Sequence, residues 1–276
     1  MKIFHIFDHS IPLHSGYTFR SRAILRQQRR NGWETFHLTS PKQGKVSQLH
    51  EVCDDLEFHR CAELEGLNAR LPVWNQWAVV AALKKRLFQL ANDLLPDILH
   101  AHSPSLNGLA ALQVGRALGI PVVYEIRAFW EDAAVDHGTT NPGSFRYRLT
   151  RALETYVAKR VDQVTVICQG LQDDLVERGL DRQQITIIPN AVEAEKFEFD
   201  APASELLQEK LGLKGKTVLG FVGSFYAYEG LDLLVTALPG IVEQNPDVHL
   251  LLVGGGPQDA NLREQVEQSG LQQSVT

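Results

Sequence analysis

Residues 217–238 read TVLGFVGSFYAYEGLDLLVTAL, and residues 249–257 read HLLLVGGGP. In each stretch an apolar segment runs into a glycine turn, and a helical pattern follows. A buried strand that ends in such a turn places free backbone N–H groups at the carboxyl edge of an open α/β sheet, where phosphate groups bind. The two stretches therefore predict an α/β fold and a phosphate-bearing ligand.

The same alternation extends over the rest of the chain and predicts a doubly wound architecture. Continuous apolarity, as in Leu250–Val253, indicates strands that are covered on both faces. The predicted strands are Ile3–Phe7, Thr35–Ser40, Asp97–His102, Pro121–Ile126, Val164–Cys168, Ile185–Pro189, Val218–Gly223 and Leu250–Gly254. An amphipathic helix is predicted over Phe145–Arg160, and the stripe expected to face the core consists of Phe145, Leu149, Ala152, Leu153, Tyr156 and Val157.

A domain boundary is predicted at Pro189–Pro202, where a strand gives way to an acidic stretch rich in turn residues. We therefore expect one Rossmann-like domain over residues 1–190, a second over residues 191–276, and a cleft between them. A doubly wound domain has about 100 residues or more. The second domain is shorter, so we expect it to be incomplete, either as a fragment or as a natural truncation.

Composition excludes several classes of protein. The net charge is −6, and acidic side chains are concentrated in residues 191–276, which argues against a uniform nucleic-acid surface. The cysteines Cys53, Cys61 and Cys168 form no CxxC pair and no even disulfide framework, which indicates a reducing compartment. No apolar run is long enough to span a bilayer. We expect a cytoplasmic protein.

Five short motifs then occur in a fixed order. On these motifs the chain resembles GT-B-fold glycosyltransferases of family 4. They are PLHSGY at 12–17, DILHAHS at 97–103, PVVYEIR at 121–127, IPNAV at 188–192 and FVGS at 221–224. The opening DHSIPLHSGYTFR at 8–20 is similar to the exosortase-A-system-associated branch, which is linked to exopolysaccharide production.

The resemblance implies two Rossmann-like domains that face a cleft, with the acceptor on the first and a nucleotide-sugar donor on the second. It implies a retaining hexosyltransferase that acts on a glycan or a lipid-linked acceptor in exopolysaccharide or cell-surface glycan synthesis. The nucleotide sugar is a substrate, so no cofactor is expected. Exposed arginines at 146, 148 and 151, with Lys84–Arg86, suit either loose contact with an anionic membrane or a solvated helix face.

The sequence departs from the family at the donor phosphates. Ala191 replaces a usual glycine, and Ser224 and Glu229 stand where the family usually has an arginine and a lysine. The paired glutamates that hold the donor sugar are expected beyond Thr276. We therefore expect these 276 residues to bind nucleotide sugar weakly and to transfer little. Two alternatives stay open, a binding module without catalysis and a GT-B sugar-nucleotide epimerase.

Catalytic roles are predicted for Arg127, His102 and Glu125. His102 ends a strand on the ligand-binding side of the sheet. Glu125 and Arg127 share one face of the next strand, where opposite charges must either pair or face a cleft. A buried salt bridge is the alternative for that pair, and a core histidine is the alternative for His102. His100 and His102 alone make a poor metal site, so no metal is expected.

Donor-binding roles are predicted for Gly16, Arg20, Gly223, Ser224, Gly254 and Gly256. The resemblance places Gly16 next to the donor phosphates. Arg20 lies in a first helical turn, where a cation opposes the helix dipole unless an anion is near. It is a candidate to replace the cations missing at Ser224 and Glu229, although a solvent-exposed arginine is the simpler alternative. Gly223, Ser224, Gly254 and Gly256 would offer backbone N–H groups at strand ends.

Overall fold

The computed structural model describes residues 1–64, 72–197 and 202–276. The chain folds into two compact units, which are described separately. Unit 1 comprises Met1–Ala133 and Pro142–Ala191, and unit 2 comprises Ala134–Asn141 and Val192–Thr276. Both are α/β, as predicted.

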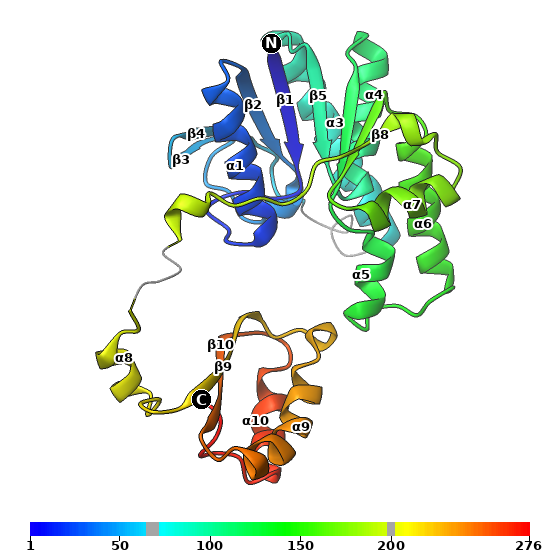
Figure 1. The fold of residues 1–276 in the computed structure, drawn as a ribbon. Helices are drawn as coiled ribbons and strands as arrows, with labels where there is room; N and C mark the ends of the chain where they lie inside the picture. Colours follow the sequence, from blue (N-terminus) through cyan, green and yellow to red (C-terminus); the bar gives the residue numbers. More distant parts are fainter. Residues whose placement is uncertain (65–71, 198–201) are drawn as a thin grey trace. The chain divides into compact units, whose positions relative to one another are not determined.

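Unit 1 is built on a sheet in the order β3-β4-β2-β1-β5-β6-β7-β8, drawn in Figure 1. All its pairs are parallel except β3–β4. The strands are β1 (Lys2–Phe7), β2 (Glu34–Thr39), β3 (His50–Cys53), β4 (Leu56–Arg60), β5 (Ile98–His102), β6 (Val122–Ile126), β7 (Gln163–Val166) and β8 (Ile185–Ile187). The helices are α1 (Gly16–Arg30), α3 (Pro72–Leu94), α4 (Ser105–Leu118), α5 (Trp130–Asp136), α6 (Phe145–Ala158) and α7 (Gln169–Glu177).

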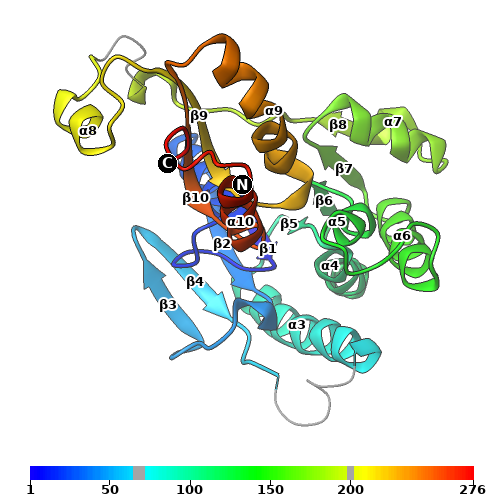
Figure 2. The same ribbon diagram turned by 90° about the horizontal axis from the view of Figure 1, so that it is seen from below.

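The two faces of this sheet are packed differently. Phe4 and Ile6 of β1 join the large apolar core formed with α3 and α4, which gather on one side of the strands in Figure 2. Phe7, on the opposite face of β1, packs with Leu25 of α1 and with Phe58 of β4. Because side chains alternate along a strand, His5 lies on the α1 face as well. That face carries the polar residues described below.

The hairpin β3–β4 was not among the predicted strands. Its turn is Asp54–Asp55, and Asp54 has φ of 54°, a conformation that Asp tolerates better than most residues. The basic face of α1 explains why the hairpin docks there. Arg22 Nη1 donates to Asp54 at 2.9 Å, and Arg26 Nη2 donates to Asp55 at 2.6 Å.

Unit 2 contains two parallel strands, β9 (Thr217–Ser224) and β10 (Val248–Gly255). Its helices are α8 (Glu205–Lys210), α9 (Leu231–Gln244) and α10 (Asp259–Gln268). Val235 and Leu238 of α9 pack with Leu250 of β10 and with Phe225 in a small core of their own. Both predicted strands of this region are confirmed.

The buried stripe predicted for α6 is wrong in part. Phe145, Leu149 and Tyr156 are 82%, 53% and 41% exposed. Val157 is buried against Gly108 of α4, as predicted, but Glu154, which the prediction left out, is buried with it. The helix turns this face inward because the Oε1 atom of Glu154 accepts a 2.6 Å hydrogen bond from the Tyr124 hydroxyl of β6. Apolar spacing alone could not reveal that a glutamate faces the core.

Glu154 should make the stability of unit 1 depend on pH. Burial, reinforced by Glu131, raises the pKa of Glu154 to about 7. In the unfolded chain the pKa is about 4.3. The folded form therefore keeps a proton that the unfolded form loses, and the free energy of unfolding should fall between about pH 4.5 and pH 7.

Glu154→Gln should remove this dependence. In urea unfolding at pH 8 the variant should be more stable than wild type by roughly 1–3 kcal/mol, and at pH 5 the two should be nearly equal. Glu177→Gln on the exposed face of α7 is the matched control and should change little at either pH. An equal effect of E154Q at both pH values would contradict the assignment.

Candidate functional site

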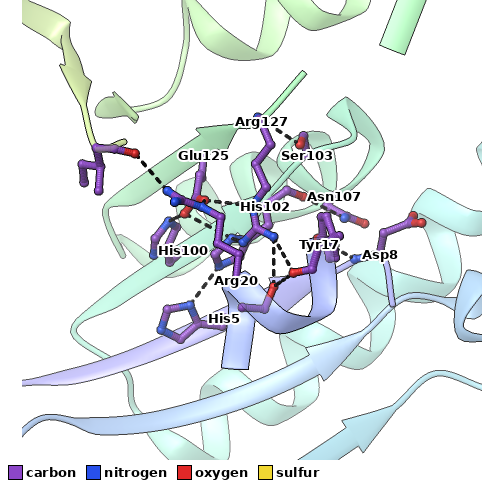
Figure 3. Close-up of polar contacts among 12 residues, drawn as sticks. His5, Asp8, Tyr17, Arg20, His100, His102, Ser103, Asn107, Glu125 and Arg127 are labelled. Atoms are coloured by element: carbon purple, nitrogen blue, oxygen red, sulfur yellow. Dashed lines mark hydrogen bonds and ion pairs between the residues drawn. The ribbon is translucent and has the colours of Figure 1, made fainter. Parts of the chain in front are cut away.

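A buried polar network lies between α1 and the carboxyl ends of β1, β5 and β6. The strand register pairs His5 with His100, and His102 with Glu125, so these side chains form two adjacent rows on the α1 face. His5, His102 and Glu125 are each no more than 3% exposed. Figure 3 shows the guanidinium groups of Arg20 and Arg127 meeting this cluster.

Glu125 is the centre of the network. Its Oε1 accepts from Arg127 Nε at 2.8 Å and from Arg20 Nε at 3.0 Å. Its Oε2 lies 3.3 Å from both His100 Nε2 and His102 Nδ1. Burial by itself would raise the pKa of this carboxyl, but the His100 ring and the charge of Arg127 beside it hold that pKa well below the usual range. Glu125 is therefore an anion shared by two cations.

The histidines form a directed chain of hydrogen bonds. Arg127 Nη2 lies 2.8 Å from His102 Nδ1, and because a guanidinium only donates, that ring nitrogen accepts. The proton of neutral His102 is then on Nε2, which donates to His5 Nδ1 at 3.0 Å. His5 Nε2 in turn donates to Gln28 Oε1 at 2.8 Å. Burial and the neighbouring imidazoles lower the pKa values of His5 and His102, which keeps both neutral.

These histidines also bear on metal binding. The candidate ligand atoms of His5, His100 and His102 lie within 4.8 Å of one another. A metal ion needs a lone pair on each ligand nitrogen. In the hydrogen-bond chain His102 uses the lone pair on Nδ1 for Arg127 and carries a proton on Nε2. The arrangement does not favour a metal, and the expectation of none stays a prediction.

Both arginines are occupied by internal partners. Arg127 Nη1 donates to Tyr17 O at 2.7 Å and to Ser21 Oγ at 3.1 Å, and the guanidinium stacks 4.3 Å above the Tyr17 ring. The Nη atoms of Arg20 donate to Ile188 O at 3.0 Å, Pro189 O at 3.1 Å and Asn190 Oδ1 at 2.9 Å. Arg127 thus holds the first turn of α1, and Arg20 holds the chain that leaves β8.

The start of α1 is exposed. Ser15 caps the helix and accepts from Thr18 N at 3.2 Å, while His9 Nε2 lies 3.0 Å from the Ser15 hydroxyl. A Cβ added at Gly16 would meet nothing within 4 Å. Gly16 lies in the same turn that Arg127 grips through Tyr17, so the structure brings Gly16, Arg20, His102, Glu125 and Arg127 to one place. Their roles remain predictions.

The predicted residues of unit 2 gather at the carboxyl ends of β9 and β10. Gly254 is paired with Gly223, and Gly255 with Ser224. A Cβ on Gly254 would come within 1.8 Å of Gly223 O, and one on Gly256 within 2.8 Å of Phe225 N. These two glycines are therefore required for the close approach of backbones within the unit, whatever ligand they meet.

Several residues of the network could not be singled out from the sequence. Tyr17, Ser21 and Gln28 act through positions on α1 that depend on how the helix lies across the sheet. Asn190 lies in the predicted hinge motif, but nothing in that motif indicates its bond to Arg20. Of the residues that follow Arg127, Glu131 is buried and paired with Arg178 at 2.7 Å. Asp132 accepts from the Tyr147 hydroxyl at 2.8 Å.

Removal of the central charge should be costly. Glu125→Gln leaves Arg127 and Arg20 without their shared counter-ion, and urea unfolding should show a loss of about 3–5 kcal/mol. Asp54→Asn is the control, since it breaks the exposed pair with Arg22 and should cost about 1 kcal/mol or less. The double variant E125Q/R127Q should lose less than the sum of the single variants. Similar losses for E125Q and D54N would refute the central role of Glu125.

Both parts of the chain match known protein families. The family described as "Glycosyl transferase 4-like domain" matches residues 15–191, and the family "Glycosyl transferases group 1" matches residues 204–276. The chain is 27% identical over 220 residues to 2-deoxystreptamine glucosyltransferase of Streptomyces kanamyceticus, covering 77% of this chain and 54% of the relative. It is 31% identical over 170 residues to phosphatidyl-myo-inositol mannosyltransferase of Mycolicibacterium smegmatis, covering 61% and 39%. The chain thus spans about half or less of the length of these relatives.

Solved structures share the fold. The Anabaena HepE complex with UDP aligns with a TM-score of 0.69 and 16% identity, over 100% of this chain and 68% of that one. Sucrose-phosphate synthase of Thermosynechococcus elongatus aligns with a TM-score of 0.72 and 18% identity, over 100% and 69%. The predicted fold class is therefore confirmed as α/β of the GT-B type, with Rossmann-like, mostly parallel sheets. None of the helices in the described ranges has the length and apolar character needed to cross a membrane.

Proposed function

Since this chain belongs to the glycosyl transferase 4-like family, whose model matches residues 15–191, we propose that it acts as a glycosyltransferase. The reaction moves a hexose from a nucleotide-sugar donor to a glycan or lipid-linked acceptor with retention of configuration. We place it in exopolysaccharide or cell-surface glycan synthesis, as the resemblance to the exosortase-A-associated branch implies. The observation that carries the proposal is the network around Glu125, which fixes the open first turn of α1 at the carboxyl edge of the sheet.

The division of labour follows the two predicted domains. Residues 1–190 take the acceptor and present Gly16, Arg20 and the catalytic set of His102, Glu125 and Arg127. Residues 191–276 take the donor, with Gly223, Ser224, Gly254 and Gly256 near the nucleoside diphosphate.

Chemistry in such a site consists mainly of positioning and of stabilising charge on the leaving diphosphate. Glu125 contributes indirectly, because it fixes the guanidinium of Arg127 and the tautomer of His102 depends on that guanidinium. The N-terminus of α1, held in place by this network, forms an environment that favours developing negative charge. Such an arrangement needs no cofactor.

The donor side is short of positive charge, and this gives a test. Ser224 ends β9 with its side chain exposed, where a cation would meet a diphosphate, while Glu229 is exposed in the following turn. Ser224→Arg should therefore tighten binding of a nucleotide sugar by roughly 1.5–3 kcal/mol, which is the size of a charge-assisted hydrogen bond.

Titration calorimetry with a panel of nucleotide sugars measures this effect. Val218→Arg adds the same charge near the opposite end of β9 and should leave the affinity nearly unchanged. In a transferase assay, Arg127→Ala should lower kcat/KM more than about tenfold. The proposal is refuted if no nucleotide sugar of the panel binds to the wild-type chain or to the Ser224→Arg variant.

We further propose that α6 rests on the cytoplasmic face of an anionic membrane that holds a lipid-linked acceptor. Phe145, Leu149 and Tyr156 form an exposed apolar stripe on this helix. Beside them lies a groove of about 570 Å³ that is lined by the basic residues Arg148, Arg151, Lys159 and Arg160. Arg178 also lines it but is buried and paired with Glu131 and Asp174, and Asp174 lies 3.9 Å from Arg151 as well. The single acidic residue of α6, Glu154, is buried on the opposite side. An apolar stripe flanked by cations is typical of a helix that lies in a membrane interface.

Vesicle binding tests this contact. The chain should bind phosphatidylcholine vesicles that contain phosphatidylglycerol and release them as salt is raised. At about 1 kcal/mol for each cation, R148Q/R151Q should weaken binding roughly thirtyfold, and F145S/L149S should weaken it at least about tenfold. R182Q and L206S remove an exposed cation and an exposed leucine elsewhere and should have little effect. Equal binding to neutral vesicles would contradict the contact.

A further inference from the structure

Arg20 links the buried charge of unit 1 to the chain that leads out of the unit. Its Nε donates to Glu125 at 3.0 Å, so the side chain is anchored to the buried carboxylate. Its two Nη atoms face the other way and make three hydrogen bonds to the segment Ile188–Asn190, which we call the exit segment. Figure 3 shows the guanidinium between these two sets of partners.

The outward partners of Arg20 are weaker than its inward one. Two are backbone carbonyls and the third is the side-chain amide oxygen of Asn190, and all are neutral. A guanidinium binds a charged phosphate oxygen more strongly than a neutral carbonyl, because both partners are then ionised and two parallel N–H···O bonds can form. The Arg20 side chain is 14% exposed, and Ile188, Pro189 and Asn190 are exposed, so a ligand can reach the Nη atoms.

We propose that Arg20 is a positioning residue that exchanges partners. Without ligand it holds the exit segment to unit 1, and with a bound diphosphate it turns its Nη donors to the anion and releases that segment. The Nε atom of Arg20 stays bonded to Glu125 in both states, so the buried carboxylate keeps both Arg20 and Arg127 as counter-ions. The inference rests on the proposed function, because it takes the donor diphosphate as the anion.

The exchange has a distinctive consequence for binding. The exit segment and the anion compete for the same two nitrogen atoms, so a weaker hold on the segment should increase the affinity for the anion. Asn190→Ala removes one competing acceptor and should therefore tighten anion binding. A purely structural role for Asn190 predicts no change or a loss.

Calorimetry with pyrophosphate and with UDP provides the first test. Removal of the exposed hydrogen bond between Arg20 and the Asn190 amide in N190A should raise the affinity by about two- to tenfold. Arg20→Gln should lower it by more than about tenfold. Arg22→Gln on the same helix, whose side chain pairs with exposed Asp54, is the matched control and should leave the affinity unchanged. Weaker binding by N190A would overturn the exchange.

A spin label reports the release itself. Val192, two residues beyond Asn190, is 74% exposed and can be changed to cysteine for a nitroxide, with Cys53 and Cys168 replaced by serine. Pyrophosphate should increase the mobility of the label in the otherwise wild-type chain. In R20Q the label should be mobile without ligand and should not respond. N190A, whose exposed side chain is not needed for the core, keeps the test decisive if R20Q fails to fold.

The two ligands separate this inference from the proposed function. If pyrophosphate mobilises the label but UDP does not bind, the exchange is supported and the nucleotide-sugar donor is rejected. If UDP binds and the label is unchanged or becomes less mobile, the donor is supported and the exchange is rejected. If neither ligand changes the label, the exchange is rejected.

Discussion

One buried carboxylate organises unit 1 at the carboxyl ends of its central strands. Glu125 is 3% exposed, and an ion so far from water is stable only with charged partners and a full set of hydrogen bonds. Arg127 and Arg20 supply the charge, and each then extends to a different part of the chain. Through Arg127 the carboxylate fixes the first turn of α1 and the tautomer of His102; through Arg20 it fixes the exit segment. The position of the helix start and the direction of the histidine chain both follow from this charge.

The candidate site was partly predictable because functional residues of open α/β sheets lie at the carboxyl ends of parallel strands. His102, Glu125 and Arg127 were found from their places at the carboxyl ends of predicted strands, and Gly16 from the first strand-to-helix turn. What the sequence could not supply were the partners. Whether Glu125 and Arg127 face a ligand or each other depends on the register of β5 against β6 and on the tilt of α1, neither of which is encoded locally. Nothing in the local sequence marks His5 and Gln28 as members of the network, since His5 lies within a strand and Gln28 near the end of a helix.

The fold shows the same division between local and non-local information. Eight strands were predicted because long apolar runs need cover on both faces. The hairpin β3–β4 was missed because its strands are short, although its Asp54–Asp55 turn was a usable signal. The inward face of α6 was misjudged for a different reason. Glu154 of α6 is buried where the Tyr124 hydroxyl of β6 donates a hydrogen bond to it. No rule of apolar periodicity places a carboxyl group in a core. Phe145, Leu149 and Tyr156, which were expected in the core, remain on the surface beside basic residues, and this arrangement is the basis of the proposed membrane contact.

The guanidinium N–H donors of Arg20 and Arg127 already have acceptors within the protein, and this affects which anions the two arginines can bind. A free guanidinium attracts any anion, including chloride or a single carboxylate, whereas one already held by neutral acceptors responds only to a ligand that offers stronger bonds. The loss of those internal bonds sets a threshold, and a diphosphate with several charged oxygens exceeds it more readily than a monoanion. Such a threshold sharpens selection for the doubly charged group, at some loss of absolute affinity. It also ties recognition to the exit segment, because the same bonds that set the threshold hold that segment in place. Selectivity and chain release in this unit would then have one physical origin, the shared anion at Glu125.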